Sequence, residues 1–300
     1  MNETAASVRV SIGLPVYNGE NYLAETLDSV SKQSFSDFEL IVCDNASSDG
    51  TQAICEAAAR NDPRIRYHRN ATNVGAAGNY NLAFELARGE FFKWAAHDDL
   101  LAPDYLRSCV DAFEKAPQDV ILCYPRTLLI DSKGQPIRQH DDKMDFREAT
   151  PHERVGRFAR SWGMCNPVFG LMRRDVLART GLIRPYISSD IPLLAELSVL
   201  GKFWEIPEAH FHRRIHELSS RQGELSLSEV ATWFDPKAKG PGWIDPRTQV
   251  FFRTLGVIAG MELPAVERMR CLVSFSVSWW LKRVRVRLGA IRRRLAGSGR

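Results

Sequence analysis

The sequence lacks long hydrophobic runs and targeting segments. None of its 300 residues belongs to a stretch of the roughly 18–20 apolar residues that a membrane-spanning helix needs. Residues 1–7 are polar, and the first apolar run, at 8–16, ends at a proline turn, which is not the pattern of a signal peptide. The chain is therefore expected to be cytoplasmic.

Cysteine pairs with metal-binding CxxC spacing and two common phosphate-binding motifs are also missing. None of the six cysteines has CxxC spacing, so we expect reduced, buried thiols and no zinc site. The turn after the first apolar run is not GxGxxG, and GxxxxGK followed by Ser or Thr occurs nowhere. These absences argue against a dinucleotide oxidoreductase and a P-loop NTPase.

Acidic residues are absent from the C-terminal segment. Residues 268–300 hold ten Lys or Arg and no Asp or Glu, although the net charge of the whole chain is only +4. Leu281, Leu288 and Leu295 recur every seven residues, so an apolar stripe can form on an otherwise basic helix. With Trp279-Trp280 before it, this pattern is typical of a helix that lies on an anionic membrane surface.

Two other interpretations of this segment stay open. The helix can pack on the body of the protein, or it can form the contact of a homodimer. A nucleic-acid partner is disfavoured, because adjacent tryptophans favour the headgroup interface of a membrane. We expect peripheral association with the inner face of the cell membrane.

The first 125 residues alternate between strand-like and helix-like patterns. Apolar, β-branched runs predict strands at 8–14, 38–43, 65–68, 91–96 and 120–124, with helices at 51–60, 76–87 and 103–115 between them. Such alternation predicts an α/β fold with a mostly parallel sheet and helices on both faces. Beyond residue 125 we expect strands at 166–173 and 202–206, helices at 175–180, 192–200 and from 248 onward, and a polar loop at 138–153.

Polar side chains directly follow several predicted strands. Asn18 follows the first, Asp44 and Asn45 the second, and Asp98 and Asp99 the fourth. In open α/β sheets, residues just past the carboxyl ends of the strands line the ligand crevice. The sequence therefore predicts one acidic cleft of nucleotide size.

Four motifs stand in this strand context and carry a family resemblance. They read Leu14-Pro15-Val16-Tyr17-Asn18-Gly19-Glu20, Asp44-Asn45-Ala46-Ser47-Ser48-Asp49-Gly50-Thr51, Asn70-Ala71-Thr72-Asn73-Val74-Gly75, and Ala87-Arg88-Gly89-Glu90 leading into His97-Asp98-Asp99. In order and spacing they resemble the family 2 glycosyltransferases of the GT-A fold, strongly over 8–125 and more weakly over 160–220. We accordingly divide the chain into a nucleotide-sugar-binding half (1–125), an acceptor-binding and catalytic half (126–220), a mobile loop (221–248) and C-terminal helices with a basic amphipathic tail (249–300).

The resemblance places the donor-binding groups in the first half. It implies that Pro15, Tyr17, Glu20 and Asp44 surround the nucleotide, and a carboxylate at a strand end suits hydrogen bonds from the base or ribose. It also implies that the stretch containing Asn73 and Gly75 contacts the donor through backbone and amide groups. The arginine often found in that stretch is missing here, since Gly78-Asn79-Tyr80 occupies its place.

Asp98 and Asp99 resemble the DXD-type motif of the family. Adjacent carboxylates repel each other, and a hard divalent cation such as Mn²⁺ or Mg²⁺ relieves that repulsion. We expect Asp99 to bind the metal and Asp98 to contact the ribose or sugar of the donor. The alternative is that these carboxylates cap the following helix.

The second half is expected to supply the catalytic base. Asp190 stands where the family has the carboxylate that takes a proton from the acceptor hydroxyl, although it can also be a helix N-cap. The segment from Arg213 to His216 resembles R-x-H-x-x-S of the family, which implies a diphosphate clamp for Arg213 and Arg214. For His216 it implies metal or diphosphate binding, with a packed loop histidine as the alternative. Trp162 lies where the family shapes the acceptor site.

These features predict a metal-dependent, inverting glycosyltransferase that uses a UDP or dTDP sugar. The resemblance alone implies the acceptor, a sugar or glycolipid hydroxyl in cell-surface polysaccharide or glycoconjugate synthesis. A non-catalytic, membrane-associated nucleotide-sugar-binding protein is an alternative, against which the joint presence of Asp44, Asp98, Asp99 and Asp190 argues. A nucleotidyltransferase is a second alternative, but no basic glycine-rich loop follows the first strand.

Overall fold

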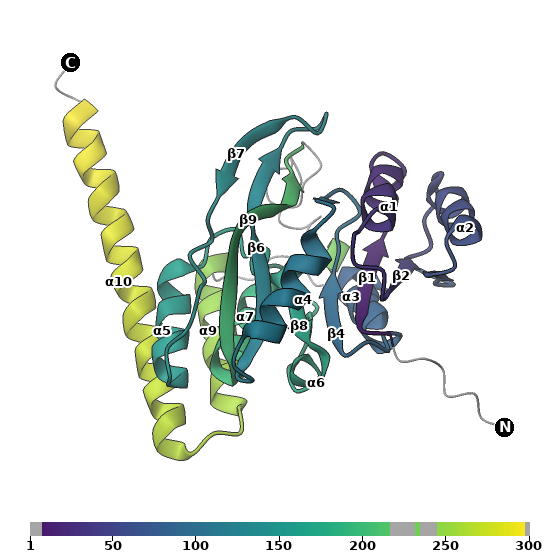
Figure 1. The fold of residues 1–300 in the computed structure, drawn as a ribbon. Helices are drawn as coiled ribbons and strands as arrows, with labels where there is room; N and C mark the ends of the chain where they lie inside the picture. Colours follow the sequence, from purple (N-terminus) through teal and green to yellow (C-terminus); the bar gives the residue numbers. More distant parts are fainter. Residues whose placement is uncertain (1–7, 217–231, 235–244, 298–300) are drawn as a thin grey trace.

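The computed structural model describes residues 8–216, 232–234 and 245–297, with residues 289–297 as backbone only. In the first half, four strands pair in parallel in the order β3-β2-β1-β4. Their bounds are β1 Val10–Val16, β2 Phe38–Asp44, β3 Ile65–Arg69 and β4 Phe91–Trp94. Because the strands are parallel, the loops that follow them gather at one edge of the sheet (Figure 1).

The sheet continues into the second half with mixed strand directions. The short strand β8 (Leu171–Arg173) is antiparallel to both β4 and β6 (Val120–Ile130), and β6 runs parallel to β9 (Lys202–Arg214). Strands β5 (Leu100–Leu101) and β7 (Pro136–His140) pair antiparallel with β9 and β6. The expected parallel sheet is therefore found in β1 to β4, and β8 joins it to the second half.

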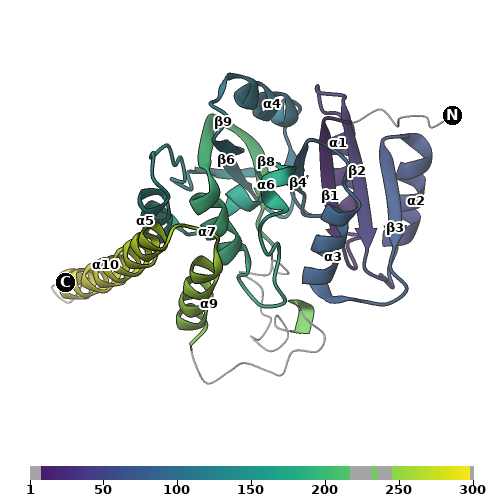
Figure 2. The same cartoon turned by 90° about the horizontal axis from the view of Figure 1, so that it is seen from below.

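Helices cover both faces of this sheet (Figure 2). One face carries α1 (Leu23–Ser31), α2 (Thr51–Asn61) and α4 (Tyr105–Lys115). The other carries α3 (Gly75–Glu85), α5 (Pro151–Ser161), α6 (Arg174–Leu177) and α7 (Asp190–Leu200), and α9 (Pro246–Gly260) and α10 (Ala265–Gly297) pack outside α7 and α5. Alternate strand residues serve the two cores, as β2 shows: Leu40 lies in the first and Ile41 in the second.

Several expected boundaries in the second half are wrong. Helix α5 begins inside the expected loop at 138–153, because Thr150 and Glu153 form a capping box around its first turn. The expected strand at 166–173 begins instead as a 3-10 turn, Asn166–Phe169, which contains a proline. Strands β6 and β9 continue to Ile130 and Arg214, because they pair with each other along their length. Most of the loop expected at 221–248 lies outside the described residues, and α9 begins at Pro246.

Helix α10 runs along α5 and then extends beyond it (Figure 1). Its inner side buries Cys271, Phe275 and Ser278. The two helices come close because α5 carries Gly156, where a Cβ atom would lie 2.3 Å from the hydroxyl oxygen of Ser274. Trp279 stacks on Phe251 of α9 with ring centroids 4.2 Å apart. Trp279 therefore packs against α9, whereas its neighbour Trp280 is 62% exposed.

Two expectations from composition can be compared with this fold. The six cysteines are free and buried, as expected of reduced core thiols. Among the described helices, none is both long enough and apolar enough to cross a membrane.

Candidate active site

The loops after β1 and β2 are joined by hydrogen bonds at the edge of the sheet. The Gly19 amide donates to Oγ1 of Thr51 (2.9 Å), and the Gly50 amide donates to Oε2 of Glu20 (2.7 Å). Glu20, expected at the nucleotide, thus holds the second loop in place. Tyr17 is 37% exposed beside it, whereas Pro15 is buried within β1.

Asp44 ends β2 and is fully buried. Its Oδ1 accepts a hydrogen bond from the Ser47 amide (2.8 Å), and its Oδ2 accepts one from the Tyr67 hydroxyl (2.8 Å) and another from Arg69. The carboxylate therefore already has three protein donors. A direct contact with a nucleotide requires displacement of Arg69, whose side chain is 33% exposed.

A network of asparagine side chains, which the sequence analysis missed, connects the ends of β2 and β3 to α3. Asn45 donates to Oδ1 of Asn73 (2.8 Å) and accepts from Asn70 (3.0 Å). Asn70 also donates to Asn79 (3.0 Å), and the Gly75 amide donates to Oδ1 of Asn73 (2.8 Å). The signal in the sequence was the placement of Asn45 and Asn70 directly after two strands. Asn73 and Gly75 are thus held in a fixed arrangement next to the first two loops.

Asp98 and His216 come together from opposite halves of the chain. Nε2 of His216 lies 2.9 Å from Oδ2 of Asp98, and the imidazole packs on Tyr22 with ring centroids 4.9 Å apart. Burial disfavours the ionised form of Asp98, but the hydrogen bond with His216 and the charges of His97 and His216 outweigh it and lower the pKa of Asp98. The pair presents one carboxylate oxygen and one imidazole nitrogen in the same place.

Asp99 has different partners. Its Oδ1 accepts a hydrogen bond from the Arg214 amide (2.9 Å), and its carbonyl oxygen accepts one from Thr26 (2.9 Å). Burial and the neighbouring charge of Asp98 raise the pKa of Asp99 to about 7. The side chain that meets His216 is therefore that of Asp98. It is thus Asp98, expected at the ribose or sugar of the donor, that stands beside His216, and not Asp99, expected at the metal.

The chemistry of this pair fits a divalent cation that takes its other ligands from a bound substrate and from water. In the described parts of the chain, no group of three or more His, Cys, Asp or Glu side chains could enclose a metal ion. Mg²⁺ in phosphate-handling sites is typically held by one or two protein carboxylates, with substrate phosphates and water as the other ligands. Two protein ligands from Asp98 and His216 are consistent with that mode of binding.

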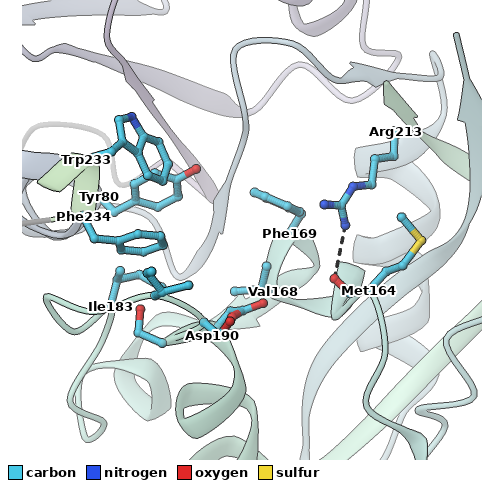
Figure 3. Close-up of a pocket in the computed structure, with 12 residues that line it drawn as sticks. Tyr80, Met164, Val168, Phe169, Ile183, Asp190, Arg213, Trp233 and Phe234 are labelled. Atoms are coloured by element: carbon cyan, nitrogen blue, oxygen red, sulfur yellow. Dashed lines mark hydrogen bonds between the residues drawn. The ribbon is translucent and has the colours of Figure 1, made fainter. Parts of the chain in front are cut away.

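The adjacent residues Arg213 and Arg214 are used differently. Arg214 is buried, and its guanidinium donates to Oε2 of Glu25 (2.6 Å) and to two backbone carbonyls. Arg213 donates to the carbonyl of Met164 (3.2 Å) and lines a pocket (Figure 3). Arg214 is therefore committed to holding β9 against α1, whereas the diphosphate contact expected of Arg213 stays a prediction.

Asp190 begins α7 and lines the same pocket as Arg213. The cavity measures about 130 Å³, and Tyr80, Trp233 and Phe234 gather on one side of it (Figure 3). Ser189 also lines the pocket, and its hydroxyl is buried with no hydrogen-bond partner among the described residues. The pocket thus combines a carboxylate, a hydroxyl and a cation with aromatic walls.

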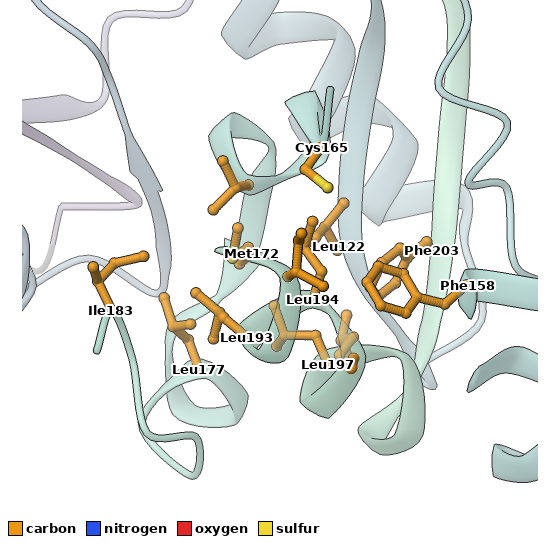
Figure 4. Close-up of a cluster of buried hydrophobic side chains, with 14 of the residues drawn as sticks. Leu122, Phe158, Cys165, Met172, Leu177, Ile183, Leu193, Leu194, Leu197 and Phe203 are labelled. Atoms are coloured by element: carbon orange, nitrogen blue, oxygen red, sulfur yellow. The ribbon is translucent and has the colours of Figure 1, made fainter. Parts of the chain in front are cut away.

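The electrostatic surroundings of Tyr80 tie this pocket to the rest of the site, and core packing holds Asp190 in it. Burial raises the pKa of Tyr80, as do the charges of Asp98, Asp99 and Asp190, while Arg213 acts in the opposite direction, so these groups lie near one ring. Helix α7 is anchored by three fully buried leucines, which pack with residues of the sheet and of α5 (Figure 4): Leu193, Leu194 and Leu197. Core packing therefore fixes the start of α7, and with it Asp190.

Trp162 lies outside this pocket. It lines a second cavity, which shares Ile187 and Ser188 with the first. The expected contact of Trp162 with an acceptor thus depends on a molecule that occupies the second cavity.

Comparison with known protein sequences finds one matching family and relatives that include glycosyltransferases. Residues 11–181 match the family described as glycosyl transferase family 2. Chondroitin synthase from Escherichia coli is 35% identical over 227 residues, which is 73% of this chain and 31% of that protein. An uncharacterized glycosyltransferase of Rickettsia felis is 35% identical over 130 residues, which is 43% of this chain and 21% of that protein. The chain therefore spans less than half the length of these curated relatives.

Solved structures share the fold. TarS residues 1–349 from S. aureus, in complex with UDP-GlcNAc, align with a TM-score of 0.65 at 20% identity, covering 90% of this chain and 72% of that one. The mannosyltransferase PcManGT from Pyrobaculum calidifontis, in complex with GDP-Man and Mn²⁺, aligns with a TM-score of 0.54 at 16% identity, covering 91% and 87%. These likenesses confirm the expected GT-A fold.

Proposed function

Because this chain belongs to glycosyl transferase family 2, we propose that it transfers a sugar from a UDP or dTDP sugar to a saccharide or lipid-linked saccharide hydroxyl. The observation that carries the proposal is the convergence of Asp98, His216, Arg213 and Asp190 near Tyr80. They supply a pair suited to a cation, a positive charge for a diphosphate, and a carboxylate in an aromatic pocket.

The proposed reaction is a single displacement with inversion at the anomeric carbon. Asp190 takes the proton from the acceptor hydroxyl as its oxygen attacks, and the Ser189 hydroxyl orients that acceptor oxygen. Asp98 and His216 would hold Mn²⁺ or Mg²⁺, which, when bound, balances charge on the leaving diphosphate. Arg213 pairs with the departing phosphate, because its guanidinium matches phosphate geometry.

We assign donor binding to the loops at the edge of β1, β2 and β3. Tyr17 and Glu20 flank the nucleotide on one side, and Asn73 and Gly75 do so on the other. Asp44 contacts the base or ribose after Arg69 moves. The asparagine network supports this assignment, because it holds the loops in one arrangement before the donor arrives and so reduces the ordering cost of binding.

Donor hydrolysis tests this function. Incubated with Mn²⁺ and UDP or dTDP sugars, the protein is expected to release the nucleoside diphosphate slowly, and chelation of the metal should stop the release. Release of pyrophosphate would instead indicate a nucleotidyltransferase. Nucleotide binding without any release from any donor would indicate a non-catalytic binding protein.

We also propose that the outer face of α10 lies on an anionic membrane. Val266, Met269, Val273, Val277 and Trp280 are all exposed along this face, three or four residues apart, as expected for one stripe of a helix. Leu288 continues the stripe, and basic side chains border it. An anionic lipid surface complements both features.

A pair of matched substitutions tests the membrane proposal. Val277 and Ile137 are each 53% exposed, but Ile137 lies on β7. Val277→Asp is expected to lower flotation with vesicles of equimolar phosphatidylglycerol and phosphatidylcholine by about tenfold or more, because it removes an apolar contact and adds a like charge at the interface. Ile137→Asp should float like the unchanged protein. Equal flotation of both variants, or none by the unchanged protein, would contradict the proposal, and concentration-dependent self-association would then point to a homodimer.

A further inference from the structure

A large cavity lies beside the pocket of Asp190, where α9 and α10 meet the loop that precedes α7. Its volume is about 600 Å³. It shares Ile187 and Ser188 with the smaller pocket. A molecule bound in the large cavity therefore has one end next to Asp190.

The walls of this cavity combine aromatic surface with positive charge. Two tryptophans line it, Trp162 and Trp279, together with four basic side chains: Arg247, Lys282, Arg283 and Arg287. None of the described residues that line it is Asp or Glu. The nearby Asp245 acts on Arg283 through its charge, but its carboxylate accepts hydrogen bonds from the first turn of α9. The cavity thus has an excess of positive charge.

Two of these cations are held in place by the tryptophans. Nζ of Lys282 donates to the carbonyl of Trp162 and lies 5.6 Å from the centre of its ring, and the guanidinium of Arg283 lies 4.6 Å from the centre of the Trp279 ring. Burial, together with the positive charge of Arg247, lowers the pKa of Lys282 to about 8. Like charges held together in a partly dry cavity repel each other, and a bound anion relieves that repulsion.

We propose that this cavity binds the phosphate or diphosphate group of a lipid-linked saccharide acceptor. Arginine and lysine side chains form charge-assisted hydrogen bonds with phosphate oxygens, and the tryptophan faces suit a sugar ring or an apolar chain. The proposal rests on the proposed glycosyltransferase function, for which it names the acceptor class. The saccharide extends past Ile187 and Ser188 to Asp190.

The position of the cavity on α10 argues for a lipid-linked phosphate rather than a free one. Arg283 and Arg287 line the cavity, and they lie three and seven residues after Trp280, which is exposed on the outer stripe. Residues at these spacings lie on the same side of a helix, within two turns of each other. A lipid chain that leaves the cavity past Arg287 therefore reaches the face of α10 that we propose to lie on the membrane.

Binding of farnesyl diphosphate, measured by calorimetry in metal-free buffer without donor, tests this inference. The diphosphate lipid is expected to bind at least about tenfold more tightly than either inorganic diphosphate or farnesol, because each of these probes lacks one of the two recognised parts. The double variant Arg283→Gln/Arg287→Gln should weaken binding by about tenfold or more, since it removes two phosphate contacts.

The matched control is Arg270→Gln/Arg285→Gln. It removes the same charge from the same helix at two exposed positions that do not line the cavity. It should bind the probe like the unchanged protein. Equal weakening by both double variants would overturn the proposal in favour of general attraction to a basic helix, and absence of binding would overturn it outright. Inorganic diphosphate binding as tightly as the lipid would overturn the lipid-linked acceptor. Because the assay contains no nucleotide sugar, its result is independent of the donor hydrolysis test.

Discussion

Replacing Asp190 with asparagine is expected to lower sugar transfer by about 10²–10⁴-fold, the usual effect of removing a general base. The affinity for UDP should stay unchanged, because none of the loop residues that we assign to the nucleotide lines the pocket of Asp190. Asparagine keeps the shape of the side chain, and the three buried leucines that anchor α7 are untouched. Transfer rates at saturating donor, together with UDP titration, give the measurement.

A control separates loss of the base from loss of charge at a helix start. Asp175 is exposed in the first turn of α6 and does not line the pocket. Asp175→Asn makes the same chemical change and should leave transfer intact. The role of Asp190 as a base is untenable if its asparagine variant keeps more than about a tenth of the original rate, a threshold well above the expected range.

The second large effect is expected at Asp98. In Asp98→Asn, the gain in UDP affinity that Mn²⁺ provides should fall by about 100-fold or more, since loss of groups that merely support a ligand already costs 10–100-fold. The physical reason is that Asp98, and not Asp99, meets the imidazole of His216. Calorimetric titration of UDP with and without Mn²⁺ measures this gain directly.

Asp99→Asn is the contrasting variant. An asparagine at this position keeps an oxygen that can accept the hydrogen bond from the Arg214 amide, so the turn that carries Asp98 should persist. We expect the Mn²⁺-dependent gain to survive in this variant. The reverse outcome, with the gain lost at Asp99 and kept at Asp98, would restore the assignment that the sequence motif favoured.

The first half of the fold could be predicted closely from the sequence. Alternation of apolar strands with amphipathic helices indicated β1 to β4 and their helices, because burial on both faces demands that pattern. Polar residues after the strands, such as Asp44 and Asp98, indicated the edge of the sheet where ligands bind. In the second half, β8 has only three residues, and the local pattern indicated only the first parts of β6 and β9, because the rest of these strands is stabilised by their pairing with each other.

The choice between neighbouring residues was also beyond the sequence. Asp98 and Asp99 are chemically identical, as are Arg213 and Arg214, and a local motif cannot say which side chain points toward a cleft. Pairing of β5 with β9 decides it, because it brings the end of β9 to the turn after β4. The backbone amide of Arg214 then donates to Asp99 and its guanidinium to Glu25, while Arg213 lines the pocket and Asp98 meets His216.

The sequence by itself determined the family, the α/β class, and the basic, amphipathic nature of the C-terminal segment, since these depend on residue order, apolar periodicity and charge. Only the tertiary structure decided what each side of α10 does. Packing against α5 and α9 buries Phe275 and covers part of Trp279, leaves Val277 and Trp280 exposed, and turns Lys282 and Arg283 toward a cavity beside Asp190. The periodicity of one helix shows that it has two faces, but it does not show what covers them, and α5, which covers most of one face, lies more than a hundred positions away in the chain.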